Sequence, residues 1–455
     1  MDYNIKDLEK WNYRIEEIAK NFGLDYYPQE FEIIDYSDML AYEVYLGMPA
    51  RYPHWSFGKA YDRLKTLYQY NFVGLPYEMV INSNPCIAYL MKDNTLLLQI
   101  LTIAHVYGHN DFFKNNRLFA EATDANYTIE MFKSNGDRIR QYINDPSIGY
   151  EEVEKILDAA HAIKLQTDRA IGVKKLSITQ LKDKIIREYK NDNSHNDLLK
   201  GNVKKPIKDI NKVPLEPEED ILGFIINYGE LYEWQKDIVQ IVKEETKYFI
   251  PQIETKIMNE GWASFWHYNI LKELKLPQGL HLEFMKRHND VITPLEGRVN
   301  PYYMGFKIYE NLYHTYGWDK IFQVRLLERD ESFIRRYLTE ELCYEMNLFQ
   351  YGKHGKDYTI EEVSDERGFK EIKNTLCESC GIGMIPHIVI ADMNTNNKIL
   401  TLEHKFDGRE LEMSYTMETL KYLVDLWKHK IILKTTLNGK DIDIVCDIDK
   451  QVSYV

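Results

Sequence analysis

A run of apolar residues from Thr95 to Phe113 constrains the fold of this chain most strongly, because it is long enough for a helix that is buried on all sides. The run contains His105 and His109, four positions apart. Residues at this spacing lie on the same face of a helix, so the two imidazoles could bind one divalent metal ion. The alternative is that they only form hydrogen bonds inside an aromatic core.

A second apolar segment, "KIMNEGWASFWHYNI", places a carboxylate where burial is costly. Glu260 lies inside this predicted helix, and a buried carboxylate needs a cation close to it. His267 follows seven residues later on the same helical face, where it could be a further ligand or could orient one. We therefore predict that His105, His109 and Glu260 converge on a divalent metal ion, zinc in the first place and iron as the alternative.

A third helical segment, "EEVEKILDAAHAIK", places Glu154, Asp158 and His161 on one face. The spacing Asp-x-x-His occurs in carboxylate-bridged metal sites, and it is equally ordinary on the surface of a helix. His161 is therefore an additional candidate ligand. A redox or oxygenase site of histidines and carboxylates would need His161 or Asp158 in direct contact with the metal.

The composition excludes several classes of protein. A net charge of −14 spread along 455 residues gives no electrostatic reason to expect nucleic acid as a partner. No stretch approaches the roughly 20 apolar residues of a membrane span, and the charged N-terminal segment is unlike a signal peptide, so we expect a cytoplasmic protein.

The five cysteines also fit a reducing compartment, because their odd number and spacing do not make a disulfide framework. Cys377 and Cys380 form the one close pair. His387 is near enough in the sequence to complete a zinc site with them, but two free thiols are the better interpretation.

The hydrophobic periodicity predicts an α+β protein. Residues 1–370 have mostly helical patterns, which are interrupted by a polar linker with prolines at about 190–215. Residues 372–455 have shorter, strand-like patterns around one helix, so we predict a small α/β domain there. The metal site is expected in a cleft of the helical part.

Turn residues predict the layout of the small C-terminal domain. Residues 387–394 have the pattern of a strand, and residues 398–413 that of a hairpin that turns at Asp407 and Gly408. After a helix, a second hairpin is expected to turn at Asn438 and Gly439, which form the dipeptide favoured in two-residue hairpin loops.

Several long segments resemble the signature segments of the SpoVR family, the stage V sporulation protein R proteins. These segments are "GMPARYPHWSFGKAYD", "AHVYGHNDFFKNN", "PQIETKIMNEGWASFWHY" and "NPYYMGF". The similarity runs over nearly the whole chain and includes "LWKHKIILKTT". The resemblance implies a link to sporulation and spore cortex formation, although such proteins also occur in bacteria that do not sporulate. It also implies a serine protein kinase of the AAA type as a possible partner, since such a kinase is often encoded nearby.

The order of three segments is similar to that in gluzincin peptidases, which implies a gluzincin-like main domain. "HVYGH" would supply two zinc ligands and the helix with "NEGWASFW" the third, as H-E-x-G-H and a following glutamate do in those enzymes. "HNDVITPLEGRVNPYYMGFKIYE" stands where some of those families supply a tyrosine that stabilises the oxyanion. The candidates that this resemblance implies are His288, Tyr302, Tyr303 and Tyr309.

One position departs from the gluzincin pattern. Val106 stands where the glutamate that activates water is expected. A positioned general base contributes about 10²- to 10⁴-fold to the rate, so an enzyme needs another proton acceptor. Glu121, just after the histidine helix, is the candidate for this catalytic role, although a solvated surface acid is an equally good interpretation.

The sequence thus predicts a metal-dependent hydrolase that acts on an amide or peptide-like bond, in a cell-wall precursor or a protein. A non-catalytic metal-binding scaffold or a regulatory partner of the kinase is the alternative, which Val106 favours. The tyrosine segment and the helix with Glu260 favour an active cleft.

Overall fold

The computed structural model describes residues 3–48, 50–69, 78–199, 211–294, 299–348, 350–354, 357–362 and 366–454. The chain divides into two compact units, one made of Met1–Gln141 and Lys247–Met384 and the other of Tyr142–Thr246 and Ile385–Val455. The second unit therefore resumes at residue 385, close to the boundary predicted at 372. It also takes in residues 142–246, which the periodicity assigns to the helical part.

The first unit is mostly helical, as predicted, and contains a small three-stranded sheet. Its helices are α1 (Ile5–Asn21), α2 (Tyr36–Val44), α3 (Trp55–Gln69), α4 (Leu96–Asn115), α5 (Arg117–Ala122), α11 (Lys256–Glu273), α12 (Gln278–Val291), α13 (Pro301–Tyr316), α14 (Trp318–Leu327), α15 (Asp330–Tyr337), α16 (Glu340–Glu345), α17 (Glu366–Glu378) and the short 3₁₀ helix η1 (Gly381–Met384). Helices α6 (Thr128–Asn144) and α10 (Glu233–Glu254) contain residues of both units.

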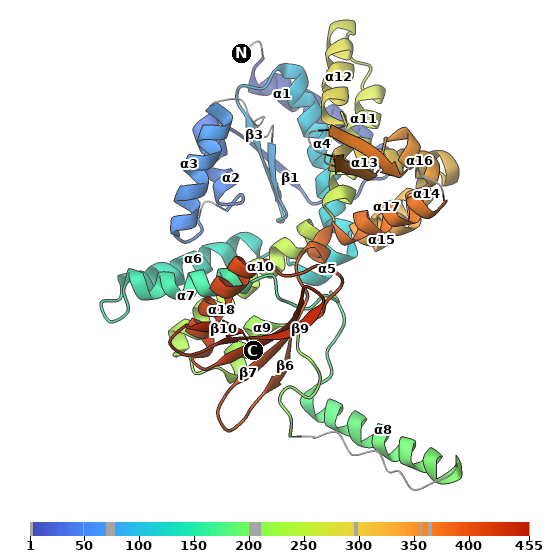
Figure 1. Ribbon diagram of the computed structural model, residues 1–455. Coiled ribbons are helices and arrows are strands. Elements are labelled where there is room, and N and C mark those ends of the chain that lie inside the picture. The colour runs from blue at the N-terminus through green and yellow to red at the C-terminus, as the bar shows by residue number, and fades with distance from the viewer. Residues whose placement is uncertain are drawn as a thin grey trace. The chain divides into compact units, whose positions relative to one another are not determined.

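The centre of this unit is formed by α4, α11 and α13, which run close together in Figure 1. Helix α4 begins at the N-cap Thr95, whose hydroxyl accepts a hydrogen bond from the backbone N–H of Leu98. It is buried along nearly its whole length, as the apolar run predicts. Trp262 and Trp266 of α11 are fully buried in the same core, where they contact aromatic rings of α13 and α14.

Glycines allow these three helices to approach each other closely. A Cβ atom at Gly108 of α4 would lie 2.7 Å from the Cα atom of Ala263 in α11. A Cβ atom at Gly261 of α11 would lie 2.3 Å from the Cα atom of Gly305 in α13. Because all of these neighbours are backbone atoms, no side chain can move aside to accommodate a larger residue. The glycines therefore determine how close the polar residues on the three helices come to one another.

The small sheet has the strand order β1 (Gln29–Ile34), β3 (Cys86–Met91) and β2 (Glu78–Ile81). Strands β1 and β3 are parallel, and β2 runs antiparallel to β3. Glu78 is the first residue of β2 and lies opposite Leu90. A separate two-stranded ribbon pairs β4 (Gln350–His354) with β5 (Asp357–Glu362).

The second unit contains a five-stranded sheet in the order β10-β9-β8-β7-β6. Its elements are α7 (Tyr150–Ile163), α8 (Ile178–Leu199), α9 (Ile221–Tyr228), β6 (Ile388–Met393), β7 (Leu400–His404), α18 (Met413–Trp427), β8 (Ile431–Leu437), β9 (Lys440–Cys446) and β10 (Val452–Tyr454). Strands β7 and β8 are parallel and are connected through α18, which packs against α7. The predicted linker begins inside α8, and residues 200–210 lie outside the described part of the chain.

One of the two predicted hairpins is confirmed. Strands β8 and β9 pair around Asn438 and Gly439, both of which have positive φ angles, as this turn requires. The hairpin predicted at Asp407 and Gly408 is wrong, because no strand follows that turn. The chain instead enters α18, since the Glu412 carboxylate accepts hydrogen bonds from the first backbone N–H groups of that helix. Strand β7 pairs with β6 and β8.

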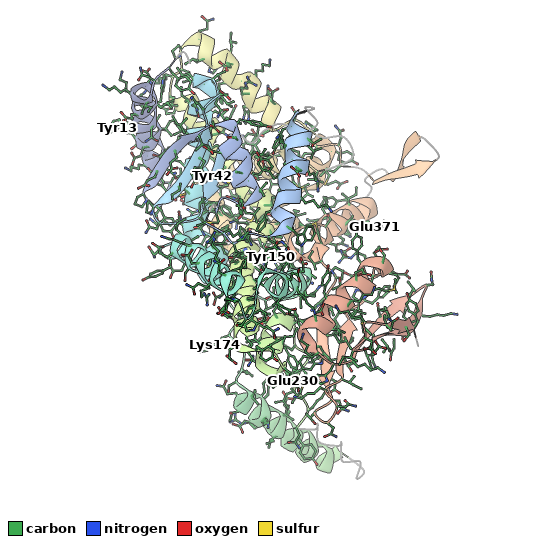
Figure 2. All side chains as sticks on the ribbon, turned by 90° about the vertical axis from the view of Figure 1, so that its left-hand side faces the viewer. Tyr13, Tyr42, Tyr150, Lys174, Glu230 and Glu371 are labelled. Carbon is green, nitrogen blue, oxygen red and sulfur yellow. The ribbon has the colours of Figure 1, made fainter. Side chains whose placement is uncertain are left out.

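The many tyrosines do not gather at one place. Tyr13 on α1 and Tyr150 on α7 are exposed (Figure 2), whereas Tyr107 and Tyr309 are buried in the core of the first unit. In the described part of the chain, none of the helices has the length and apolar character that crossing a bilayer requires.

The glycine contacts generate a test of this packing. Replacing Gly261 by alanine should lower the free energy of unfolding by about 1–3 kcal/mol, because the new methyl group must push α11 away from α13. Gly279→Ala on α12 is the matched control, since nothing lies within 4 Å of a Cβ atom there. Thermal denaturation of both variants checks this. A Gly261→Ala protein as stable as the control would contradict the described contact.

Candidate metal centre

Helices α4 and α11 bring His105, His109 and Glu260 together, as their spacing in the sequence predicts. The Nε2 atom of His109 lies 3.5 Å and that of His105 lies 3.8 Å from the same carboxylate oxygen of Glu260. These distances are too long for good hydrogen bonds. They approach the separation of about 3.3 Å between two ligands of a tetrahedral zinc ion. Metal binding by these three residues remains a prediction.

Strand β2 adds a fourth group that the sequence analysis missed. The Oε1 atom of Glu78 lies 3.9 Å from the Nε2 atom of His105. One ligand atom each of Glu78, His105 and His109 lie within 4.8 Å of one another, so Glu78 as well as Glu260 is close enough to bind an ion together with the two histidines. Because Glu78 lies on a separate strand, no helical spacing connects it with the histidines. Only the pairing of β2 with β3 brings it to α4.

The other ring nitrogens of both histidines are already engaged. His109 donates a hydrogen bond from Nδ1 to the amide oxygen of Asn259, at 2.9 Å. The Nδ1 atom of His105 lies 2.9 Å from the Nδ1 atom of His267. The Nε2 atom of His267 is in turn hydrogen-bonded to Nδ1 of His288, at 2.8 Å. If His105 donates its Nδ1 proton to His267, both histidines have their proton on Nδ1. The Nε2 atoms that face Glu260 then carry free lone pairs, as a metal ligand requires.

The environment of these groups fits a cation. The carboxylate oxygen of Glu260 that faces the histidines is buried and has no hydrogen-bond partner. Burial alone would raise the pKa of Glu260, but His105, His109 and Lys256 outweigh it and hold the pKa below its usual value. Burial lowers the pKa of His109 to about 4, so this imidazole is neutral at pH 7. An anionic carboxylate with an unpaired buried oxygen beside two imidazoles, each engaged at its Nδ1 atom, is a suitable set of ligands for a divalent ion.

Tyr302 is the tyrosine of the predicted segment that reaches this site. Its ring lies 6.1 Å from that of His105 between centroids, and it lines the same cleft as Glu260. The negative charge of Glu260, together with burial, raises the pKa of Tyr302 well above its usual value, so the hydroxyl remains a donor at neutral pH. Tyr303 packs instead against the apolar core, and Tyr309 is fully buried beside Trp262.

The cleft at this site has a volume of about 290 Å³. It is lined by Glu78, Val80, His109, Phe113, Gln252, Lys256, Asn259, Glu260 and Tyr302. Val106 is fully buried and does not line the cleft, so the helix position that carries the base in gluzincins faces the protein interior here.

Several predicted site residues lie elsewhere. His267 and His288 are fully buried behind His105 and form a hydrogen-bonded chain with it, so they are not placed to bind the metal directly. Glu121 is exposed on α5 beside Arg117, at 3.9 Å, and does not line the cleft. His161 lies on α7 of the second unit and therefore does not belong to the cluster that the first unit forms by itself.

The thiols of Cys377 and Cys380 are free and buried. The Sγ atom of Cys380 lies 3.2 Å from the carbonyl oxygen of Cys377, and burial raises the pKa of both thiols. His387 belongs to the other unit and is bonded to Glu219 at 3.0 Å. These contacts therefore support the interpretation that Cys377 and Cys380 are two buried free thiols and not zinc ligands.

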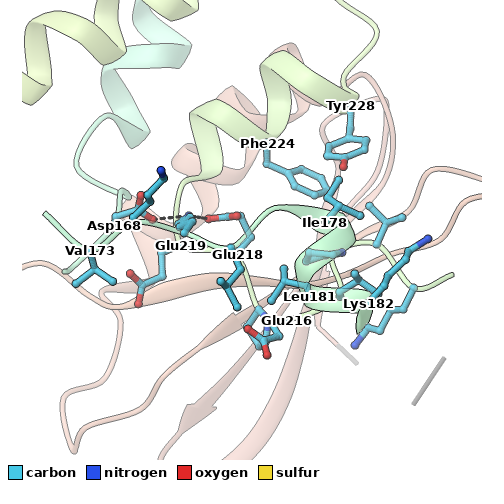
Figure 3. Close-up of a pocket in the computed structure, with 18 of the residues that line it drawn as sticks. Asp168, Val173, Ile178, Leu181, Lys182, Glu216, Glu218, Glu219, Phe224 and Tyr228 are labelled. Carbon is cyan, nitrogen blue, oxygen red and sulfur yellow. Dashed lines mark hydrogen bonds and ion pairs between the residues drawn. The ribbon is translucent and has the colours of Figure 1, made fainter. Parts of the chain in front are cut away.

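The second unit contains a larger cavity, of about 600 Å³. Phe224 and Tyr228 of α9 lie along one side of it (Figure 3). Lys175 forms ion pairs there with Asp168, at 2.6 Å, and with Glu218. None of the residues that line this cavity is a histidine or cysteine, so it does not resemble the metal centre of the first unit.

Sequence comparisons agree with the family that the motifs indicate. The family model described as SpoVR like protein matches residues 2–385, and the one described as SpoVR-like C-terminal domain matches residues 386–438. The chain is 32% identical to the uncharacterized protein YcgB of Escherichia coli strain K12 over 486 residues, which cover 98% of this chain and 94% of that protein. No solved structure matches the chain.

The hydrogen bond between His105 and His267 generates a prediction about metal affinity. His267→Leu removes the ring nitrogen that orients His105, so we expect zinc affinity to fall by about 10- to 100-fold. Competition with a chelator measures this affinity, and His281→Leu, at an exposed position on α12, is the control. An unchanged affinity would show that His267 does not orient His105. Complete loss of zinc from a folded variant would show that it binds the metal directly.

Proposed function

The chain belongs to the SpoVR family, and we propose that it is a metal-dependent hydrolase that cleaves an amide or peptide-like bond. One observation carries the proposal: a buried, unpaired oxygen of Glu260 lies beside two histidine Nε2 atoms, and the Nδ1 atoms of both rings are already hydrogen-bonded. We propose that His105, His109 and Glu260 hold the ion and that the ion is zinc, with iron as the alternative.

A divalent ion at this site would polarise the scissile carbonyl and lower the pKa of a water molecule. The protein groups around it then have separate tasks. Glu260 faces both histidines and is held anionic by its neighbours, which suits a ligand. Glu78 lies 3.9 Å from the Nε2 atom of His105 and has a ligand atom within 4.8 Å of one of His109, and burial raises the pKa of its carboxyl group, which suits a proton acceptor. We therefore propose that Glu78, and not Glu121, is the general base that activates water. In gluzincins a glutamate at the position of Val106 has this role.

Tyr302 is proposed to donate a hydrogen bond to the oxyanion that develops on the substrate carbonyl. It lines the cleft beside Glu260, and its raised pKa keeps the proton on the hydroxyl. Tyr303 lies outside the cleft and has no role in this proposal.

The alternative is a metal-binding scaffold without catalysis, which the buried Val106 favours. A regulatory partnership with a serine protein kinase would fit that alternative. A cytoplasmic location, a role in sporulation or spore cortex formation, and a cell-wall precursor as substrate follow from the family resemblance and from the free cysteines, and they remain proposals.

The metal content of purified protein tests the ligand assignment. We expect about one equivalent of zinc in the wild type and a loss of at least tenfold in affinity for each of His105→Ala, His109→Ala and Glu260→Gln, because each change removes one ligand. Elemental analysis after purification without added metal gives the result. Iron in place of zinc would favour a redox site, and a wild type without metal would contradict the proposal.

The catalytic assignment is tested by Glu78→Gln and Tyr302→Phe in the zinc-loaded protein. Loss of the proton acceptor should lower turnover by about 10²- to 10⁴-fold. Loss of the tyrosine hydroxyl should lower it by about 10²- to 10³-fold. Both variants should keep the metal. Release of free amines from a panel of acyl amino acids and dipeptides measures turnover.

Matched controls separate these roles from general effects. Glu121→Gln and Tyr303→Phe make the same chemical changes outside the cleft and should leave turnover unchanged. A fall in metal content in Glu78→Gln would make Glu78 a ligand. If Glu121→Gln lost turnover and Glu78→Gln did not, Glu121 would be the general base, as the sequence analysis suggests.

A further inference from the structure

Lys256 supplies the one positive side chain among the described residues that line the cleft. It is exposed, and it forms no ion pair with the described carboxylates. Its charge acts on Glu260 and Asp330 only at longer range. An ammonium group that faces a cleft and has no counter-ion there is available to a ligand.

The position of Lys256 relative to the metal centre follows from the helix. Lys256 and Glu260 are four residues apart on α11, so they lie on the same face and about 6 Å apart along the axis. The start of this helix is held in place because the carboxylate of Asp330 accepts the backbone N–H groups of Ile257 and Met258, both at 2.9 Å. The backbone positions of Lys256 and Glu260 relative to each other are therefore well fixed, and the flexible lysine stem carries the ammonium.

The charges of the cleft favour an anion. A divalent ion would be balanced by the two carboxylates that lie beside the histidines, those of Glu78 and Glu260. Lys256 then leaves one net positive charge in a cleft of about 290 Å³. That volume is just below the range of about 300–1,000 Å³ for small-molecule sites. Its size and charge suit a small anionic molecule.

We propose that the substrate of this site is a small amide with a carboxylate group close to the bond to be cleaved, and that the ammonium of Lys256 binds that carboxylate. The carboxyl end of a peptide and an acyl amino acid both have a carboxylate close to an amide bond. The assignment rests on the proposed metal-dependent function and adds the substrate class to it. Lys256 is a specificity residue here and takes no part in holding the metal.

The test compares two metal-binding probes on the full-length protein loaded with cobalt(II). Succinic acid monohydroxamate carries a carboxylate, and butyric hydroxamate has the same chain length without it. The visible spectrum of the cobalt reports binding of each probe. We expect the carboxylate probe to bind about tenfold more tightly to the wild type, because it gains a charge-assisted hydrogen bond.

Substitutions of lysine then identify the source of the preference. Lys256→Met should abolish it, while cobalt content and the affinity for butyric hydroxamate stay as in the wild type. Lys256→Arg should retain it. Lys272→Met is the matched control, because it removes the same charge from the last turn of the same helix, outside the cleft.

Each result has a distinct meaning. Equal affinity of the two probes for the wild type, or a preference that survives in Lys256→Met, would overturn the role of Lys256 and leave the metal site standing. Loss of cobalt from Lys256→Met would also overturn it, since Lys256 would then help to form the metal centre. A wild type that binds no cobalt would overturn the proposed function itself.

Discussion

Backbone contact between helices at Gly108, Gly261 and Gly305 determines where the polar side chains of the candidate metal centre lie. With a Cβ atom at any of these positions, α11 could not approach α4 and α13 as closely as it does. The three helices carry the two histidines, Glu260 and Tyr302, respectively, and their aromatic core is fully buried around these contacts. Dense packing of this kind holds ligands within the tolerance that a metal site needs. Sheet pairing adds Glu78 from the side.

The electrostatics of the site follow from this packing. Glu78, Glu260 and several histidines lie within one largely buried region, and burial penalises the charged forms of both carboxylates and of His109, His267 and His288. His105 and His109 are hydrogen-bonded through their Nδ1 atoms to His267 and Asn259, respectively, and the unpaired oxygen of Glu260 faces their Nε2 atoms. A divalent cation would satisfy that oxygen and both lone pairs at once. This gives a physical reason for so many polar groups inside a helical core.

Local sequence rules predicted the parts of the site that lie on a single helix. The four-residue spacing placed His105 and His109 on one face, and the cost of burying a carboxylate identified Glu260. Turn chemistry likewise predicted the hairpin at Asn438. It failed at Asp407, where no second strand forms because Glu412 caps the start of α18. Glu78 could not be found in this way, because strand pairing alone brings it to α4. Glu121 is near the histidine helix in the sequence, but it faces solvent.

The central claim is that His105, His109 and Glu260 bind one metal ion. A crystal of the zinc-loaded protein, measured at the zinc absorption edge, tests it most directly. The account predicts one anomalous peak in the first unit, about 2.0–2.2 Å from the two Nε2 atoms and from a carboxylate oxygen of Glu260. A peak bound by other residues, or a zinc-saturated crystal without a peak at these three side chains, would contradict it.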